Sequence, residues 1–257
     1  MSVSTQQSQT GPTYGPGQIT LNQWDDMPED YRGMVRYLVG RQLQGEIAAC
    51  ELFARAVQYV DTPQQKVELT QTAMEEANHV QIVSELAPKI GIDMDELIRT
   101  RRPLATWFLG DVDDVKDWTE LCVFKFLVDR AGNVWLWSMR DTSFKPYGDT
   151  MIPIMRDESR HQTEGARGVL AEIAHGRREL VQQYVNKWFP RAMKLLGRPQ
   201  SKGNQLAHKY GLKGPDSEVE MRKYLGEIQP TITKAGLALP SPDDLRAMGI
   251  DIRSVAW

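Results

Sequence analysis

Two stretches of the chain, MEEANH at 74–79 and RDESRH at 156–161, share one spacing. In each, a glutamate stands three positions before a histidine, so both side chains lie on one face if the stretch is helical. The chain has only four histidines, and a third, His175, follows Glu172 at the same spacing. Random placement would give fewer than one such pair. These stretches therefore decide which fold we expect.

The sequence around the pairs repeats its apolar residues with the period of an α-helix, and no stretch alternates with period two. This pattern predicts a mostly helical protein. We expect long helices over 28–60, 63–90, 115–140, 150–175 and 178–196. We also expect a shorter helix with a connecting loop over 93–114, irregular chain over 198–215, one short helix over 217–229 and an irregular end. The turns fall at 61–63, at Gly91 and in DTSFKPYGD at 141–149.

The faces of these helices distinguish the three pairs. Glu76 shares its face with apolar residues at 69, 73, 80 and 83, and Glu158 shares its face with those at 151, 154 and 155. A carboxylate that faces a core is costly unless it is paired or bound to a metal. These two pairs are therefore candidates for a metal site.

Partner carboxylates follow from hairpin geometry, because residues at equal height lie symmetrically about the turn. Glu46, which faces apolar neighbours, pairs with Glu76 about residue 61. Asp129 pairs with Glu158 about a point between residues 143 and 144. If Glu120 were the partner of Glu158, the symmetry point would fall inside a helix. We therefore expect Glu120 to be a solvated acid near a helix start.

The third pair fails this test. A partner for Glu172 would fall in the turn at 141–149. We therefore expect Glu172 and His175 to form a solvated helix end.

Six residues emerge as candidate metal ligands, namely Glu46, Glu76, His79, Asp129, Glu158 and His161. The two halves repeat with offsets of 82 or 83 residues. A four-helix bundle can hold two iron or manganese ions with one acid from each of two helices and a Glu-x-x-His pair from each of the other two. The four acids are the candidate catalytic residues. Glu75 and Asp157 precede Glu76 and Glu158, and Arg160 precedes His161; these three residues are expected to support the ligands from outside. The alternative is that these groups only bond one another, or face solvent.

Composition narrows the functional class. The chain has 257 residues, 41% of them apolar and 25% charged, with a net charge of -3. This composition excludes a mainly disordered chain, and neither a nucleic-acid partner nor a membrane span is expected. Two isolated cysteines and the lack of an apolar leader favour a cytoplasmic protein. We expect a flexible tail over 1–20, a metal-binding helical bundle over 21–197 and a C-terminal extension with a short helix over 198–257.

Several motifs resemble those of the di-iron catalytic subunits of bacterial aromatic acyl-CoA epoxidases, the phenylacetyl-CoA epoxygenase and benzoyl-CoA epoxidase family. The resemblance spans 27–242. The motifs that resemble the family are MPEDYR (27–32), GEI around Glu46, MEEANH (74–79), FLVDRAG (126–132), RDESRHQTEGAR (156–167), NKWFPRAM (186–193) and SKGNQLAHKYGLKG (201–214). The family places a carboxylate ligand at the Asp of FLVDRAG, which is Asp129 here.

The resemblance implies an all-α, ferritin-like bundle that holds two iron ions (Fe²⁺/Fe³⁺), takes O₂ as co-substrate and acts as a mono-oxygenase. Its substrate would be the aromatic ring of a CoA thioester, phenylacetyl-CoA or benzoyl-CoA. Electrons would come from a flavin and iron-sulfur reductase, and the chain would pair with a second ferritin-like subunit or with itself. Thr72 stands where the phenylacetyl-CoA subunits carry a lysine, so the substrate is left open.

Two other functions fit the same ligands, namely a ferritin-like di-iron oxygenase with a non-CoA substrate and a ferritin-like metal-binding protein for storage. A third alternative is a non-catalytic scaffold subunit, and the presence of all six candidate ligands speaks against it. Four aromatic residues, Phe53, Phe126, Trp135 and Trp137, are candidates for the wall of a substrate pocket or for ordinary core.

Overall fold

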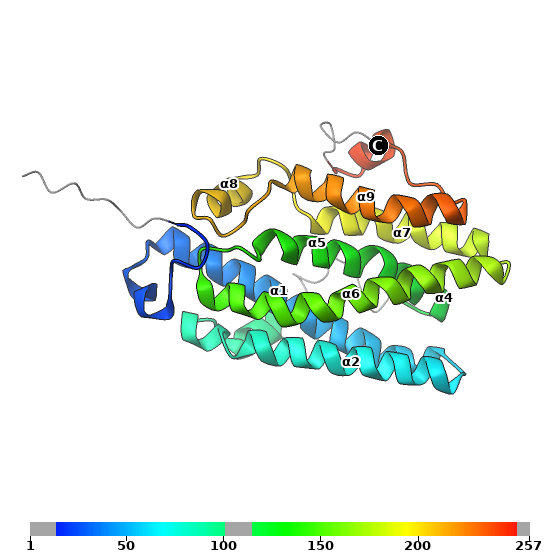
Figure 1. Ribbon diagram of the computed structural model, residues 1–257, viewed down its shortest axis with the longest axis horizontal. Helices are drawn as coiled ribbons and strands as arrows, with labels where there is room; N and C mark the ends of the chain where they lie inside the picture. The colour runs from blue at the N-terminus through cyan, green and yellow to red at the C-terminus, as the bar shows by residue number, and fades with distance from the viewer. Residues whose placement is uncertain (1–13, 101–114, 251–257) are drawn as a thin grey trace, which may run out of the picture.

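The computed structural model describes residues 14–100 and 115–250, and this part of the chain is helical without a β-strand (Figure 1). The all-α, ferritin-like class is confirmed. The α-helices are α1 (Glu29–Ala56), α2 (Pro63–Ser84), α4 (Trp118–Phe124), α5 (Arg130–Met139), α6 (Lys145–Ala174), α7 (Arg178–Leu195), α8 (Lys202–Lys209), α9 (Ser217–Ala235) and α10 (Pro242–Ala247). Shorter helical segments are η1 (Leu21–Asp26), η2 (Val57–Tyr59), η3 (Ala87–Ile90) and the π-helical η5 (Lys125–Asp129). Residues 94–100 are also helical.

Four long rods form the bundle as two hairpins, as the sequence predicts. The first hairpin is α1 with α2, and the second is the continuous rod α4–η5–α5 with α6 (Figure 1). Local chemistry marks the first turn, because the Thr62 side chain accepts a hydrogen bond from the Gln65 backbone N–H and Pro63 begins α2. Gly91 then ends η3 with a φ of 78°. The two symmetry points used to pair the carboxylates both fall in the observed turns.

The second hairpin differs from the prediction in two places. Helix α6 begins at Lys145 rather than at 150, because Pro146 is suited to a first turn and Lys145 pairs with Asp149 at 2.7 Å. The predicted turn at 141–149 is therefore shorter. The third rod contains the π-helical turn at 125–129, which the regular apolar period does not reveal.

The C-terminal region is more regular than predicted. Ser201 caps α8 within the stretch expected to be irregular, and α9 continues past residue 229 to Ala235, before Gly236 at a φ of 62°. Helix α10 lies in the expected irregular end. The apolar face of α9 is buried in the same core as the bundle, and it comprises Met221, Tyr224, Ile228 and Ile232. Burial of this face explains why the helix persists through Pro230.

Part of the expected tail is packed against the bundle. The Ile19 backbone N–H donates to the Ser143 carbonyl at 2.8 Å, the Lys145 N–H donates to the Ile19 carbonyl at 2.9 Å, and the Ile19 side chain is buried. The Tyr14 ring stacks on Tyr31. These contacts hold residues 14–20 in place, which a sequence rich in Gly, Pro and Gln did not indicate.

Two glycines allow α6 to approach the third rod closely. A Cβ atom at Gly165 would lie against the backbone N of Phe126 and 2.7 Å from the carbonyl carbon of Lys125, and one at Gly168 would lie against the Cys122 side chain. The third rod therefore lies closer to α6 than a residue with a Cβ atom at these two positions would allow. This contact fixes the height of Asp129 relative to α6.

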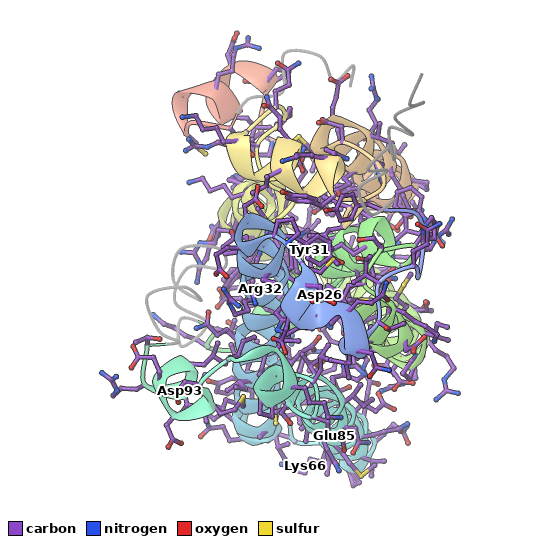
Figure 2. The ribbon with its side chains drawn as sticks, turned by 90° about the vertical axis from the view of Figure 1, so that its left-hand side faces the viewer. Asp26, Tyr31, Arg32, Lys66, Glu85 and Asp93 are labelled. Atoms are coloured by element: carbon purple, nitrogen blue, oxygen red, sulfur yellow. The ribbon has the colours of Figure 1, made fainter. Side chains whose placement is uncertain are left out.

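The end view shows how the remaining segments surround the bundle. In Figure 2, η1 with Asp26 lies across the near end, and α2 with Lys66 and Glu85 forms the edge opposite α8 and α10. Within the described residues, no helix has the length and apolar content required to cross a membrane.

Candidate metal centre

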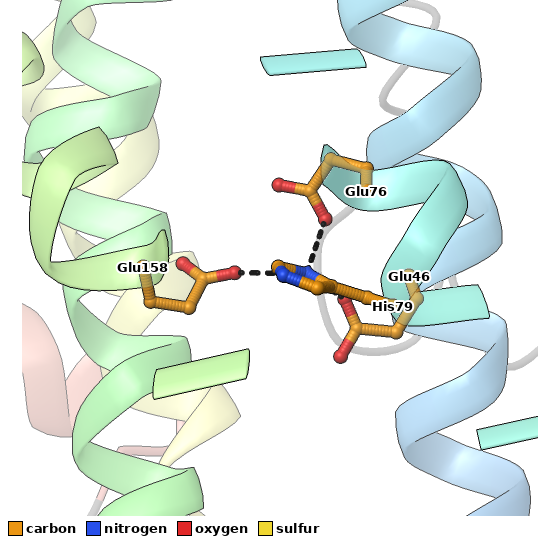
Figure 3. Close-up of side chains that lie close together, drawn as sticks. All are labelled: Glu46, Glu76, His79 and Glu158. Atoms are coloured by element: carbon orange, nitrogen blue, oxygen red, sulfur yellow. Dashed lines mark ion pairs between the residues drawn. The ribbon is translucent and has the colours of Figure 1, made fainter. Parts of the chain in front are cut away.

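Five of the predicted acids and histidines converge from three rods of the bundle. Glu46 comes from α1, Glu76 and His79 from α2, and Glu158 from α6, and their side chains point toward one another (Figure 3). One ligand atom from each of these four lies within 4.8 Å of those of the other three. His161, one turn after Glu158, joins the cluster through Glu76 and Glu158.

All of these side chains are buried. Glu76 is 1% exposed, both histidines are 0% exposed, and Glu46 and Glu158 are 7% exposed. Removing several carboxylates from water is unfavourable unless protons or cations compensate their charge. The cluster therefore requires counter-charge.

The two glutamates of the Glu-x-x-His pairs lie between the two imidazoles. Glu76 places Oε2 3.4 Å from His79 Nδ1 and Oε1 3.2 Å from His161 Nδ1. Glu158 does the same, with Oε1 3.8 Å from His79 Nδ1 and Oε2 3.7 Å from His161 Nδ1. Each glutamate thus presents one oxygen to each histidine. Glu46 adds an oxygen 3.5 Å from His79 Nδ1.

Several inward atoms have no hydrogen-bond partner. Among the described residues, Nδ1 of both histidines, Oε2 of Glu76 and Oδ2 of Asp129 are buried without one. Buried polar atoms are nearly always satisfied in folded proteins. Buried atoms of this kind, close to several carboxylates, are suited to metal coordination.

The outward nitrogens of the histidines are held by the acids that precede the two central glutamates. Nε2 of His161 lies 2.9 Å from Glu75 Oε2, and Nε2 of His79 lies 3.3 Å from Asp157 Oδ2. Each acid thus contacts the histidine of the other hairpin. Arg160 ion-pairs with Glu75 and with Glu164. The geometry places all three predicted supporting residues around the histidines, and such contacts fix which imidazole nitrogen faces inward.

Asp129 comes from the third rod, α4–η5–α5. It is the last residue of η5 and lines one cavity together with Glu46, Glu76 and Glu158. Burial, followed by the charge of Glu158, raises the pKa of its carboxyl well above the usual value. The charge of His161 acts in the opposite direction on this carboxyl and favours its ionised form.

The other pKa values follow from the same crowding. Burial raises the pKa of Glu46 to about 7 and also raises that of Glu158. Burial alone would lower the pKa of both imidazoles, but the surrounding carboxylates raise both to about 11. Without cations, the cluster compensates its charge by holding protons, and cations would displace them.

A small cavity of about 110 Å³ opens beside the acids. Of the four aromatic residues considered from the sequence, only Trp135 lines it within the described residues, whereas Phe53 packs near His161, with ring centres 6.1 Å apart. Phe124 lines the cavity and was not predicted. It stands five residues before Asp129, a spacing that shares one face in a π-helical turn but not in an α-helix.

Two expectations about solvated acids are wrong. Glu120 is 1% exposed and accepts hydrogen bonds from Lys187 Nζ at 2.5 Å and Trp188 Nε1 at 2.9 Å. Glu172 is 3% exposed and accepts from Arg177 at 2.6 Å and from Thr119. Helix α7 packs over Glu120, and the apolar pattern of a single helix does not show which other helix will pack against it. His175 is exposed, as expected.

Comparison with known proteins gives two findings. A family model described as phenylacetic acid catabolic protein matches residues 60–251 of the chain. The chain is also similar to one of the subunits of 1,2-phenylacetyl-CoA epoxidase from Escherichia coli (strain K12). The two are 22% identical over 225 residues, which cover 85% of this chain and 72% of the relative.

Proposed function

The chain belongs to the family of phenylacetic acid catabolic proteins, and we propose that it is an iron-dependent oxygenase subunit that epoxidises the aromatic ring of a CoA thioester. Phenylacetyl-CoA and benzoyl-CoA are the substrates considered. The observation that carries this proposal is the pair of buried, unpartnered Nδ1 atoms, both of which face oxygens of the same two glutamates. This arrangement is suited to two neighbouring metal ions.

The residues fit two ions in number and chemistry. Glu46 and His79 would hold one ion, Asp129 and His161 the other, and Glu76 and Glu158 would be shared. Carboxylate and imidazole donors suit iron or manganese. Four carboxylates also balance the charge of two divalent cations, which would account for acids in a core.

Two bound iron ions would supply the reduction of O₂, with electrons from a flavin and iron-sulfur reductase. The chain's own residues have other tasks. Asp157 and Glu75 accept the outward N–H of the imidazoles and so hold Nδ1 inward. Because the acids lie in an apolar core, bulk water is kept from the reacting atoms.

The cavity beside the cluster fits one aromatic ring. Its volume of about 110 Å³ is comparable with the roughly 150 Å³ of a cavity known to bind benzene. Ala49, Phe124, Val128 and Leu136 give it an apolar wall. A ring bound there would lie against the carboxylates that hold the metal ions.

The name of the relative describes one component of an epoxidase with several chains. We therefore include a partner in the proposal, either a second ferritin-like subunit or a second copy of this chain. A chemically reduced protein makes the test of this function independent of the partner and of the reductase.

A single-turnover experiment tests the proposal. The chain is loaded anaerobically with two equivalents of Fe²⁺, mixed with ¹⁸O₂ and phenylacetyl-CoA or benzoyl-CoA, and its products are analysed by mass spectrometry. We expect up to one labelled oxygen atom per chain in the aromatic product, since two Fe²⁺ supply two electrons. Oxidation of the iron with no labelled product, at a rate that neither thioester changes, would contradict it. Uptake of many irons per chain would indicate storage instead.

A further inference from the structure

Two rows of residues, one on α1 and one on the third rod, line the cavity beside the four acids. Residues four positions apart are neighbours on one face of a helix. The rows have this spacing, and they consist of Arg41, Gly45 and Ala49 on α1 and of Val128, Gly132 and Leu136 on the rod. Each row therefore has a glycine at its centre.

Neither glycine is required by the packing of the chain. A Cβ atom placed on Gly45 or on Gly132 meets no other part of the structure within 4 Å, and neither residue has a positive φ. Alanine is more favourable than glycine in the interior of a helix. The two glycines thus forgo helix stability and leave space open on the cavity side.

Two glutamines of α1 line the same cavity with unsatisfied oxygens. Gln42 is 4% exposed and Gln44 is 2% exposed, and among the described residues Oε1 of each is buried without a hydrogen-bond partner. The Gln42 amide is held in one orientation, because its Nε2 donates to Glu46 Oε1 at 3.0 Å. Buried acceptors are nearly always paired in folded proteins. These oxygens therefore point to a ligand in the cavity.

An aromatic ring suits this combination of apolar wall and acceptor oxygens. The edge of such a ring carries partial positive charge and its faces are apolar. Its C–H edge can face the oxygens of Gln42 and Gln44, while its faces pack on side chains such as Phe124 and Val128. A saturated ring of similar size lacks this distribution of charge.

We propose that Gly45 and Gly132 are specificity-determining residues, which leave room for one unfused aromatic ring beside the acids. The inference rests on the proposed function, and it deepens that function by limiting the substrates to thioesters with a single ring. The cavity of about 110 Å³ is smaller than the roughly 150 Å³ cavity that binds one benzene molecule. A second, fused ring does not fit.

A methyl group on either glycine would take up space that the ring requires. Protein interiors are close-packed, and extra methyl groups in a filled site are not accommodated without displacement. An alanine at either position should therefore reject the ring and still admit a small acyl group. Because the new methyl group meets no other part of the structure, the fold should tolerate it.

Calorimetric titration of the iron-loaded chain under nitrogen tests the inference without turnover. The ligands are phenylacetyl-CoA, benzoyl-CoA, acetyl-CoA and naphthylacetyl-CoA, which differ only in the acyl group. The test variants are Gly45→Ala and Gly132→Ala. The matched control is Gly33→Ala, since Gly33 also lies in α1 with nothing within 4 Å of an added Cβ but does not line the cavity.

We expect the unaltered chain to bind the tighter of the two single-ring thioesters at least tenfold more tightly than acetyl-CoA. Naphthylacetyl-CoA should bind no more tightly than acetyl-CoA. Each test variant should bind the single-ring thioester at least fivefold more weakly and acetyl-CoA within twofold, whereas the control should change neither by more than twofold. The thermal midpoints of all three variants should be unchanged or up to about 4 °C higher.

Test variants that keep the tenfold preference would overturn the assignment. Midpoints well below that of Gly33→Ala would also overturn it, because they would give the two glycines a packing role. Tight binding of naphthylacetyl-CoA, or an unaltered chain without preference for a ring, would contradict the limit to a single ring. Failure of the proposed function has a different readout, namely a lack of labelled product in single turnover while these affinity ratios stand.

Discussion

Glu75 on α2 and His161 on α6 lie on different hairpins, yet Glu75 Oε2 is 2.9 Å from His161 Nε2. Asp157 and His79 repeat this relationship in the opposite direction, at 3.3 Å. Each hairpin thus holds the histidine of the other. The two contacts join the hairpins at the height of the candidate metal centre, so the orientation of each imidazole depends on both halves of the bundle.

Removal of the Glu75 carboxylate tests this dependence. We expect Glu75→Ala to weaken iron binding by about tenfold to a hundredfold, because the His161 ring loses the acceptor that orients it. Glu75→Gln, which keeps an acceptor oxygen, should recover most of the affinity. Iron titration measures both, and the exposed Glu85→Ala on the same rod is the control. Equal affinity in Glu75→Ala and Glu85→Ala would contradict the role assigned to this contact.

The close contact at Gly165 leads to a second prediction. Gly165→Ala would push α6 away from η5, because the new methyl group meets the backbone of Lys125 and Phe126. We expect a loss of about 2 kcal/mol in the free energy of unfolding and a lower iron content, since Asp129 ends η5. Denaturant unfolding and iron analysis measure the two effects.

Gly33 provides the matched control for this substitution. It lies in α1 with nothing within 4 Å of an added Cβ, so Gly33→Ala should leave stability unchanged or raise it by up to about 1 kcal/mol. If Gly165→Ala were as stable and as iron-rich as Gly33→Ala, the close approach would not position Asp129.

The buried acid under α7 gives a third prediction. Glu120→Ala leaves Lys187 Nζ and Trp188 Nε1 without their acceptor, and we expect it to destabilise the chain by about 3 kcal/mol. Its iron stoichiometry should not change, because Glu120 does not line the cavity at the cluster. Thermal unfolding and iron analysis separate the two. A loss of iron from a folded Glu120→Ala protein would show that Glu120 belongs to the metal centre.

The sequence predicts much of this arrangement because helices and hairpins obey simple geometry. The helical period sets the faces of Glu76 and Glu158, and reflection about the two turns selects Glu46 and Asp129 as their partners. Both symmetry points lie in observed turns, and these four acids line one cavity.

The features that sequence reasoning missed depend on packing between distant segments. The π-helical turn changes which residues share a face with Asp129, so Phe124 rather than Phe126 lines the cavity. Helix α7 buries Glu120, and α8 with residues 248–250 lines a cavity of about 480 Å³ beside α1 and α7. A one-dimensional pattern holds no information on such contacts. It also gave no sign that Glu75 would contact the histidine of the opposite hairpin.

In the proposed metal centre, two metal ions share Glu76 and Glu158. The most direct test is the number of tightly bound irons per chain, measured together with Mössbauer spectra, in the unaltered protein and in Asp129→Ala and Glu76→Ala. We expect two coupled irons in the unaltered protein, about one in Asp129→Ala and a loss at both positions in Glu76→Ala. A single uncoupled iron in the unaltered protein, or full occupancy in Glu76→Ala, would contradict it.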